Sequence, residues 1–259
     1  MLHKALSACD DVEVHHEYMV HIVQPLAVRR YLDVCDASEA IRALSAVYSA
    51  AIHYSAAAHW GDSSNKVSWL IPELAALLPE AKFVHLVRDG RKVASSYFNK
   101  LGDECYDDRS TAVLQAFADN RARHPAPPPE KKYWWPVPRK GDPRAAQFRN
   151  YSQFERIAWH WVEINRTILS SLGALPPWRQ HFVRLEDLRA GPGAMRGLSD
   201  FLNLPYRDAL YAMFARPHNV NRPRDTLLDD DQRARFDAIA GTAMTLFGYD
   251  TPEEYVVNY

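Results

Sequence analysis

The pattern of apolar and polar residues between positions 81 and 98 predicts a buried strand followed by a helix. A short apolar run, typical of a strand covered on both faces, ends where Asp89 and Gly90 supply a turn and a helix cap. The run consists of Phe83, Val84, Leu86 and Val87. The polar face of the helix, at spacings i, i+4 and i+8, consists of Arg88, Lys92 and Ser96. Its core-facing side consists of Val93, Ala94 and Tyr97.

Helical periodicity recurs in both halves of the chain. Asp36, with Glu39 three residues later, predicts a capped helix that runs to about His59. Ser152 and Glu155 form a capping box that opens the longest apolar stripe of the sequence. We interpret two residues off that stripe as edge packing, namely Trp159 and His160. The remaining predicted elements are a strand over 181–185, a helix beginning near Pro192 and a helix over 229–248.

The segment 102–150 interrupts this regular pattern. Its clustered prolines exclude a regular helix and a central strand from the stretch PAPPPEKKYWWPVPRKGDPR. Lysines and arginines flank the consecutive aromatic residues Tyr133, Trp134 and Trp135 there. We therefore predict a long insertion, acting either as a basic, aromatic lid over an anionic or sugar-like acceptor, or as a solvated loop that its tryptophans fix to the body.

Composition sets the outer limits of the fold and of the possible partners. A chain of 259 residues with 47% hydrophobic and 24% charged residues fits a single domain spanning 1–259. The net charge of −1 provides no global positive field, so we expect no nucleic acid partner. No apolar run reaches membrane-spanning length. Three scattered cysteines without C-x-x-C spacing favour reduced thiols and a cytoplasmic location.

The strand–helix corner at Arg88 is suited to an anion. Unpaired backbone N–H groups at a helix start carry partial positive charge, and Arg88 and Lys92 add to it. The motif R-D-G-R-x-V-A-x-S at this corner resembles that of the sulfotransferases that use 3′-phosphoadenosine 5′-phosphosulfate (PAPS). The resemblance implies that Arg88 and Ser96 hold the 3′-phosphate of the donor. The alternative is a surface Arg88 paired with Asp89.

Two further segments carry the resemblance, in the order usual for the family. They are WGDSSNKVSWLIPELAALLPEAKF before the corner and HFVRLEDLRAGPGAMRGLSDFLNLP after it. The family fold is α/β, with a central, mostly parallel sheet between two layers of helices, as in P-loop nucleoside triphosphate hydrolases. In the second segment we predict a turn at Glu186 and Asp187. We interpret these two residues as helix caps and hydrogen-bond anchors, with a catalytic role as the alternative. The resemblance also makes Arg222 and Arg224 weak candidates for the 3′-phosphate site.

The sequence departs from the family pattern in two places. The first strand and the Gly-rich loop that wraps the 5′-phosphosulfate are not found, and MLHKALSACDDVEVHHEY resembles the helix and strand that normally follow that loop. We expect either a shortened chain, which would keep the function, or a true loss, which would abolish it. At WGDSSN, Ser63 replaces the lysine that polarises the transferring group, and Lys66 substitutes for it if the turn folds back.

Glu17 is our first candidate for the general base. The segment VEVHHEY resembles the part of protein-tyrosine sulfotransferases that carries the catalytic glutamate. His15 and His16 are rivals, since other family members use a histidine, and an exposed loop carboxylate is the structural alternative for Glu17. The resemblance implies a transferase that moves the sulfuryl group of PAPS to a hydroxyl or amine. We expect a small-molecule or carbohydrate acceptor, and the sequence leaves sugars, phenols, lipid head groups and peptides open.

Two other functions compete with sulfuryl transfer. One is a noncatalytic relative that binds a nucleotide or another anion. The other is a phosphotransferase that uses ATP, which is disfavoured because the sequence holds neither a G-x-x-x-x-G-K-[ST] loop nor a carboxylate set for magnesium. The expected chemistry needs no metal and no redox cofactor, and the oligomeric state is left open.

Overall fold

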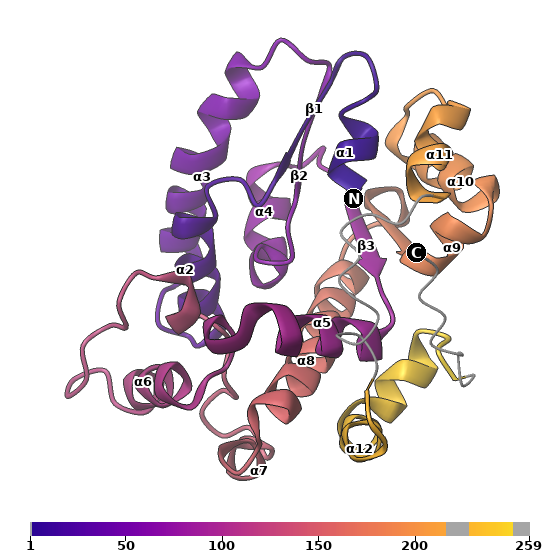
Figure 1. Cartoon of the computed structure of the whole chain (residues 1–259). Coiled ribbons are helices and arrows are strands. Elements are labelled where there is room, and N and C mark those ends of the chain that lie inside the picture. Colours follow the sequence, from indigo (N-terminus) through magenta and orange to yellow (C-terminus); the bar gives the residue numbers. More distant parts are fainter. Residues whose placement is uncertain (1, 216–227, 251–259) are drawn as a thin grey trace.

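A computed structural model describes residues 2–215 and 228–250 of the chain (Figure 1). Helices predominate and surround a small number of short strands. The described strands are β1 (Val12–His16), β2 (His59–Ser63), β3 (Phe83–Val87) and β4 (Gln180–Arg184). The α/β class with parallel strands, expected from the sequence, is confirmed.

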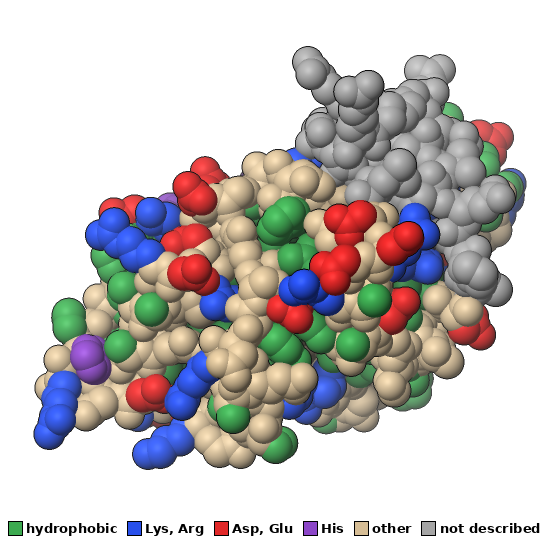
Figure 2. Space-filling model, turned by 60° about the horizontal axis from the view of Figure 1, so that its bottom comes forward, with side chains coloured by type: hydrophobic (Ala, Val, Ile, Leu, Met, Phe, Trp, Pro, Cys, Tyr) green, Lys and Arg blue, Asp and Glu red, His purple; other side chains and the backbone are tan. Residues whose placement is uncertain are grey.

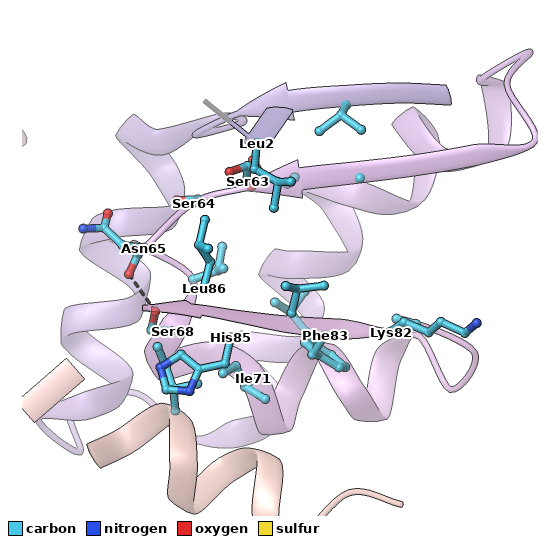
Figure 3. Close-up of a pocket in the computed structure, with 18 of the residues that line it drawn as sticks. Leu2, Ser63, Ser64, Asn65, Ser68, Ile71, Lys82, Phe83, His85 and Leu86 are labelled. Carbon is cyan, nitrogen blue, oxygen red and sulfur yellow. Dashed lines mark hydrogen bonds between the residues drawn. The ribbon is translucent and has the colours of Figure 1, made fainter. Parts of the chain in front are cut away.

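The parallel strands form two separate pairs in the described part of the chain. β1 pairs with β2 from Val12↔His59 to His16↔Ser63, and β3 pairs with β4 in the same manner. We expected one continuous central sheet, but β2 and β3 are not hydrogen-bonded to each other. A cavity lies between them (Figure 3), so each pair has its own hydrogen-bond ladder.

Helices build the layer around β1 and β2. They are α1 (Leu2–Leu6), α2 (Val20–Tyr31), α3 (Ala37–Tyr54), the 3₁₀ turn η1 (Ser68–Leu70) and α4 (Ile71–Leu77). The Asp36 side chain accepts a hydrogen bond from the Glu39 N–H at the start of α3, as predicted. The helix ends five residues earlier than expected, at Tyr54, because the chain must turn before β2 begins at His59.

Three helices meet at Gly90, the first residue of α5. They are α5 (Gly90–Leu101), α8 (Gln153–Gly173) and α12 (Asp230–Leu246). A Cβ atom at Gly90 would lie 2.7 Å from ring atoms of both Trp161 and Phe236, so only glycine permits this approach. The predicted capping box of α8 is present, and α12 begins with a second one, at Asp229 and Gln232, which was not predicted. α8 has neighbours on several sides, which is why Trp159 and His160 are fully buried instead of lying at an edge.

The insertion 102–150 contains more helix than its sequence predicted. Its elements are η2 (Gly102–Glu104), α6 (Asp108–Asp119), η3 (Lys131–Tyr133) and α7 (Ala145–Arg149). The prediction missed α6, whose apolar face is short and is buried through Leu114 and Phe117. Its cap is local, since the Asp107 side chain accepts a hydrogen bond from the Ser110 N–H.

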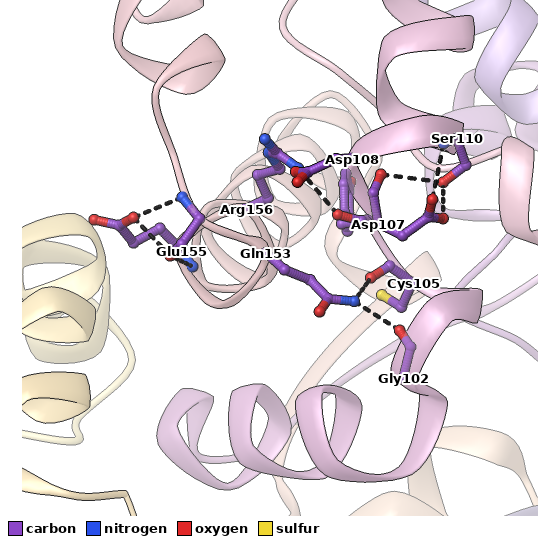
Figure 4. Close-up of polar contacts among 10 residues, drawn as sticks. Gly102, Cys105, Asp107, Asp108, Ser110, Gln153, Glu155 and Arg156 are labelled. Atoms are coloured by element: carbon purple, nitrogen blue, oxygen red, sulfur yellow. Dashed lines mark hydrogen bonds and ion pairs between the residues drawn. The ribbon is translucent and has the colours of Figure 1, made fainter.

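The tryptophans of the insertion fix it to the body of the protein. This attachment is part of the second of the two alternatives predicted from the sequence. Trp134 and Trp135 are buried, and their indole N–H groups donate to the carbonyl oxygens of Pro128 and Glu104. The start of α8 adds polar contacts, in which Gln153 donates to the Gly102 and Cys105 carbonyls (Figure 4). The tryptophans are therefore part of the core, whereas residues 119–126 and 128–131 of the insertion are exposed.

In the described part of the chain after β4, the elements before α12 are α9 (Leu185–Ala190), α10 (Pro192–Leu202) and α11 (Asp208–Ala215). The predicted turn at Glu186 and Asp187 is thus the first turn of α9. None of the helices in the described ranges is long and apolar enough to cross a membrane. Acidic and basic side chains are interspersed on the face shown in Figure 2, in keeping with a net charge of −1.

Candidate functional site

Polar residues follow the carboxyl ends of β1, β2 and β3. Glu17 comes after β1, Asn65 and Lys66 come after β2, and Arg88 comes after β3. Parallel strands present these ends at a common edge, which is where ligands bind in open α/β folds. Glu17, Asn65 and Arg88 line one cavity of about 1140 Å³. The carboxyl ends of the strands therefore bring together polar groups that the sequence analysis had identified.

Arg88 is exposed and borders this cavity. Its backbone is fixed, because the Trp161 indole N–H donates to the Arg88 carbonyl oxygen over 3.1 Å. Asp89 next to it is fully buried, and both of its carboxylate oxygens accept hydrogen bonds from Arg91, at 3.0 and 2.7 Å. Burial alone would raise the pKa of Asp89, but the hydrogen bonds and charge of Arg91 lower it. The partner that holds both oxygens of Asp89 is therefore Arg91.

The two other residues of the predicted polar face lie on α5. Lys92 and Ser96 are both half-buried, so neither is sealed in the core. Holding of a 3′-phosphate by Arg88 and Ser96 remains a prediction.

Tyr97 packs against the core, as predicted, and it also lines the cavity. Its hydroxyl oxygen accepts a hydrogen bond from the Asn65 side-chain amide over 2.7 Å. Burial raises the pKa of Tyr97, and the charges of Glu17 and Arg88 act on the same hydroxyl. Sequence reasoning missed this site residue because aromatic residues at helical spacing usually belong to the core. Its hydrogen-bond partner, Asn65, lies in WGDSSN, the segment whose departure from the family pattern had been noted.

Glu17 lies directly after β1, with a left-handed backbone (φ 55°). Its N–H donates to the Ser63 carbonyl oxygen over 3.3 Å, which ties the residue to the end of β2. The Lys131 ammonium of the insertion lies 3.1 Å from the Glu17 carboxylate. The Glu17 side chain is 21% exposed, so it remains accessible beside the cavity that it lines.

The two histidines before Glu17 are engaged elsewhere. His15 Nε2 lies 2.6 Å from a Glu13 carboxylate oxygen, and its ring packs against Tyr18 and Trp60. His16 lines the cavity, but its Nδ1 hydrogen-bonds the Ser63 carbonyl over 2.9 Å, and its ring stacks on His3. Glu17 is therefore the candidate whose side chain meets the insertion at the strand edge.

Lys66 is buried at the end of the turn that follows β2. The Ser64 hydroxyl oxygen accepts a hydrogen bond from the Lys66 N–H, which closes the turn. The side chain is 3% exposed, and its ammonium lies 3.7 Å from the centre of the Trp135 ring. Burial lowers the pKa of Lys66 to about 7, although the charge of Glu17 acts in the opposite direction. The turn thus brings Lys66 into the electrostatic field of Glu17.

His160 of α8 also lines the cavity and has a buried ring. Its Nδ1 lies 3.1 Å from the Tyr106 hydroxyl. Burial, with the nearby charge of Lys66, lowers the pKa of His160 to about 3, which keeps the imidazole neutral. A neutral ring beside Lys66 adds no positive charge to the site.

Glu186 and Asp187 serve as hydrogen-bond anchors, as first interpreted. Glu186 accepts hydrogen bonds from the Tyr249 hydroxyl at 2.6 Å and from the Asp89 N–H at 3.3 Å. Asp187 forms an ion pair with Arg184. The weak candidates Arg222 and Arg224 lie outside the described residues.

A search of curated proteins finds no match. Among solved structures, the chain is similar to the sulfotransferase domain from the curacin biosynthetic pathway, with 14% identity and a TM-score of 0.41. That match covers 91% of this chain and 97% of the other. The model of the sulfotransferase family matches residues 3–127, a range that includes β1, β2, β3 and α5. The resemblance of this chain to the sulfotransferase family is therefore confirmed over residues 3–127.

Proposed function

We propose that this protein transfers a sulfuryl group from PAPS to a hydroxyl or amine of a small molecule or carbohydrate. The observation that carries the proposal is that Glu17 and Arg88 line one cavity, with the buried Lys66 in the turn that follows β2. In-line sulfuryl transfer needs a base on the acceptor side and positive charge around the transferring and leaving oxygens. This edge supplies both kinds of group.

Arg88 and Ser96 are assigned to the 3′-phosphate of the donor. Arg88 is exposed at the rim of the cavity, and Ser96 is half-buried on the adjoining helix. A guanidinium can form two parallel hydrogen bonds to a phosphate, which fixes orientation as well as charge. The half-buried Lys92 adds positive charge on the same helix.

Glu17 is assigned as the base. Its carboxylate would take the proton of the acceptor hydroxyl or amine while a bond forms between the acceptor atom and sulfur. The bond from sulfur to the 5′-phosphate oxygen breaks, and adenosine 3′,5′-bisphosphate leaves with that electron pair. Lys66 would act on the developing negative charge only through space, because its side chain is buried against the Trp135 ring and is not among the residues that line the cavity.

Binding of a nucleotide without transfer is the second candidate. The pairing of Glu17 with Lys131 supports it, because a base held by an ammonium at 3.1 Å is less available to a substrate. The two functions share the role of Arg88 and differ in turnover.

The experiment is to incubate the protein with PAPS and a panel of phenols, sugars and amines, and to quantify adenosine 3′,5′-bisphosphate. Acceptor-dependent formation of this product is expected. Tight binding of the nucleotide without any acceptor-dependent product would select the noncatalytic function. Turnover of ATP with strict magnesium dependence would instead revive the phosphotransferase.

A further inference from the structure

A second cavity lies where the end of the insertion meets α8. Its volume is about 460 Å³, which falls within the roughly 300–1,000 Å³ usual for small-ligand sites. The segment from Arg139 to Arg144, which leads into α7, forms most of its lining, and Arg166 of α8 completes it. None of these residues lines the cavity at the strand edge. The two cavities are therefore separate.

The helix α8 lies between the two cavities. His160, Ile164 and Ile168 line the cavity at the strand edge, and their four-residue spacing places them on one helix face. Arg166 and its ion-pair partner Glu163 lie on the opposite face, since each residue turns an α-helix by about 100°. A ligand in the second cavity would therefore leave the strand-edge cavity free.

A buried carboxylate fixes two arginines at the second cavity. Glu163 is fully buried and accepts hydrogen bonds from Arg144 at 2.9 Å and from Arg166 at 2.7 and 3.1 Å. The buried Tyr31 hydroxyl also donates to it, over 2.8 Å. Burial alone would raise the pKa of Glu163, but these hydrogen bonds lower it, so the carboxylate stays ionised. In the described part of the chain, the Nη1 groups of Arg144 and Arg166 have no acceptor.

The second cavity carries an excess of positive charge. Its cationic lining residues are Arg139, Lys140, Arg144 and Arg166. Asp142 and Glu163 neutralise two of these charges through their ion pairs with Arg144 and Arg166. Within residues 2–215 and 228–250, no carboxylate pairs with Arg139 or Lys140. Two positive charges are therefore left to a ligand.

Arg139 is held in position without a carboxylate. Its guanidinium carbon lies 4.3 Å from the centre of the Tyr31 ring, in a cation–π contact. The backbone is also fixed, because the Asp142 N–H donates to the Arg139 carbonyl oxygen over 3.0 Å. A cation–π contact uses the face of the guanidinium and leaves the N–H donors at its edge available. Arg139 thus presents an oriented set of donors at an exposed position.

We propose that this second cavity binds a phosphate dianion, either free or as the monoester of a small molecule. A phosphate monoester carries about 1.5 to 2 negative charges at neutral pH and has three strong acceptor oxygens. This charge matches the excess of two positive charges, and guanidinium groups bind phosphate oxygens through paired hydrogen bonds. A carboxylate, with one charge and two oxygens, would leave part of the cationic set unused. The inference does not depend on sulfuryl transfer.

The test is titration calorimetry with glycerol 1-phosphate in an Arg88→Ala background, which removes the guanidinium assigned to the donor phosphate. Saturable binding is expected. Adding Arg139→Gln should weaken it by about tenfold or more, because a hydrogen bond to a charged group is lost. Arg123→Gln is the matched control, since it removes the same charge from an exposed position of the insertion outside the cavity, and it should leave the affinity unchanged. Equal affinities of these two variants, or no saturable binding, would overturn the proposal.

Two further ligands define the chemistry of the site. Tighter binding of glycerol 1-phosphate than of inorganic phosphate would assign the site to a small-molecule ester, and the reverse order would assign it to free phosphate. Acetate, which carries one charge, should bind about tenfold more weakly than either. Equal binding of acetate would contradict a site for a dianion.

A measurement on the unsubstituted protein avoids any effect of substitution on folding. The backbone amide NMR signals of Lys140 and Gly141, which line the cavity, should shift as phosphate is added. Unchanged signals at these two residues, at phosphate concentrations that saturate the calorimetric titration, would contradict the assigned place of binding.

Discussion

The ammonium of Lys131 lies 3.1 Å from the carboxylate of Glu17, although 114 residues separate them in the sequence. This contact joins the insertion to the strand edge. Lys131 begins the turn η3, which leads into the buried Trp134 and Trp135. The insertion therefore covers the base candidate with a basic residue held in place by the core.

Glu17→Gln tests the base directly. The amide keeps the size of the side chain but cannot take a proton, so transfer should slow by about a hundredfold to ten-thousandfold. Affinity for adenosine 3′,5′-bisphosphate should be preserved. Initial rates and calorimetric titration measure the two effects, with His15→Gln and His16→Gln as matched variants. Unchanged turnover in Glu17→Gln would remove this residue from the chemistry and direct attention to the histidines.

Lys131→Met tests whether the ion pair with Glu17 is mainly structural. Because the Lys131 side chain is 49% exposed, solvent screens the pair, and its loss should change the free energy of unfolding by less than about 1 kcal/mol. Chemical denaturation of this variant, beside Lys140→Met at an exposed position of the same insertion, gives the comparison. A loss of several kcal/mol would show that the insertion depends on this contact.

Lys66→Met should change how stability depends on pH. Burial lowers the pKa of Lys66 to about 7, whereas an unfolded lysine stays protonated to about pH 10. Between these values the unfolded chain binds more protons, so this residue makes the free energy of unfolding rise from about pH 7 to about pH 10 and makes it level off below pH 7. From pH 7 to 8.5 the wild type should gain roughly 1 kcal/mol per pH unit relative to Lys66→Met. Parallel curves for the two proteins would place the Lys66 amine in water.

Gly90→Ala tests the contact between α5, α8 and α12. The added methyl group would lie 2.7 Å from ring atoms of Trp161 and Phe236, and such overpacking costs about 1–3 kcal/mol. Gly197→Ala is the matched control, because nothing lies within 4 Å of its Cβ position in α10. The control should be neutral or gain about 0.5–1 kcal/mol from better helix propensity. Equal stability of the two variants would contradict the close packing at Gly90.

Elements with a strong local signal could be predicted from the sequence. The strand before Arg88, the capping box at Ser152 and the helix after Pro192 all appear where expected. In each case neighbouring residues determine the structure, through an apolar run or a cap. The α/β class followed from these elements and from the family motifs.

The remaining features depend on contacts between distant segments. The hydrogen bond between Tyr97 and Asn65, and the burial of Lys66 on Trp135, arise only when three parts of the chain meet. Likewise, the apolar face of α6 is short, and it is buried by packing against aromatic residues of the same insertion, such as Trp134. No periodicity in the sequence identifies such partners.

Binding of adenosine nucleotides to Arg88→Ala tests the central claim most directly. The guanidinium is assigned to the 3′-phosphate, and a hydrogen bond to a charged group is worth about 1.5–3 kcal/mol. Titration calorimetry should therefore show a loss of roughly tenfold to a hundredfold for adenosine 3′,5′-bisphosphate. Adenosine 5′-phosphate, which lacks that group, should bind the variant and the wild type alike. Equal losses for the two nucleotides would contradict the assignment of Arg88 and with it the proposed use of PAPS.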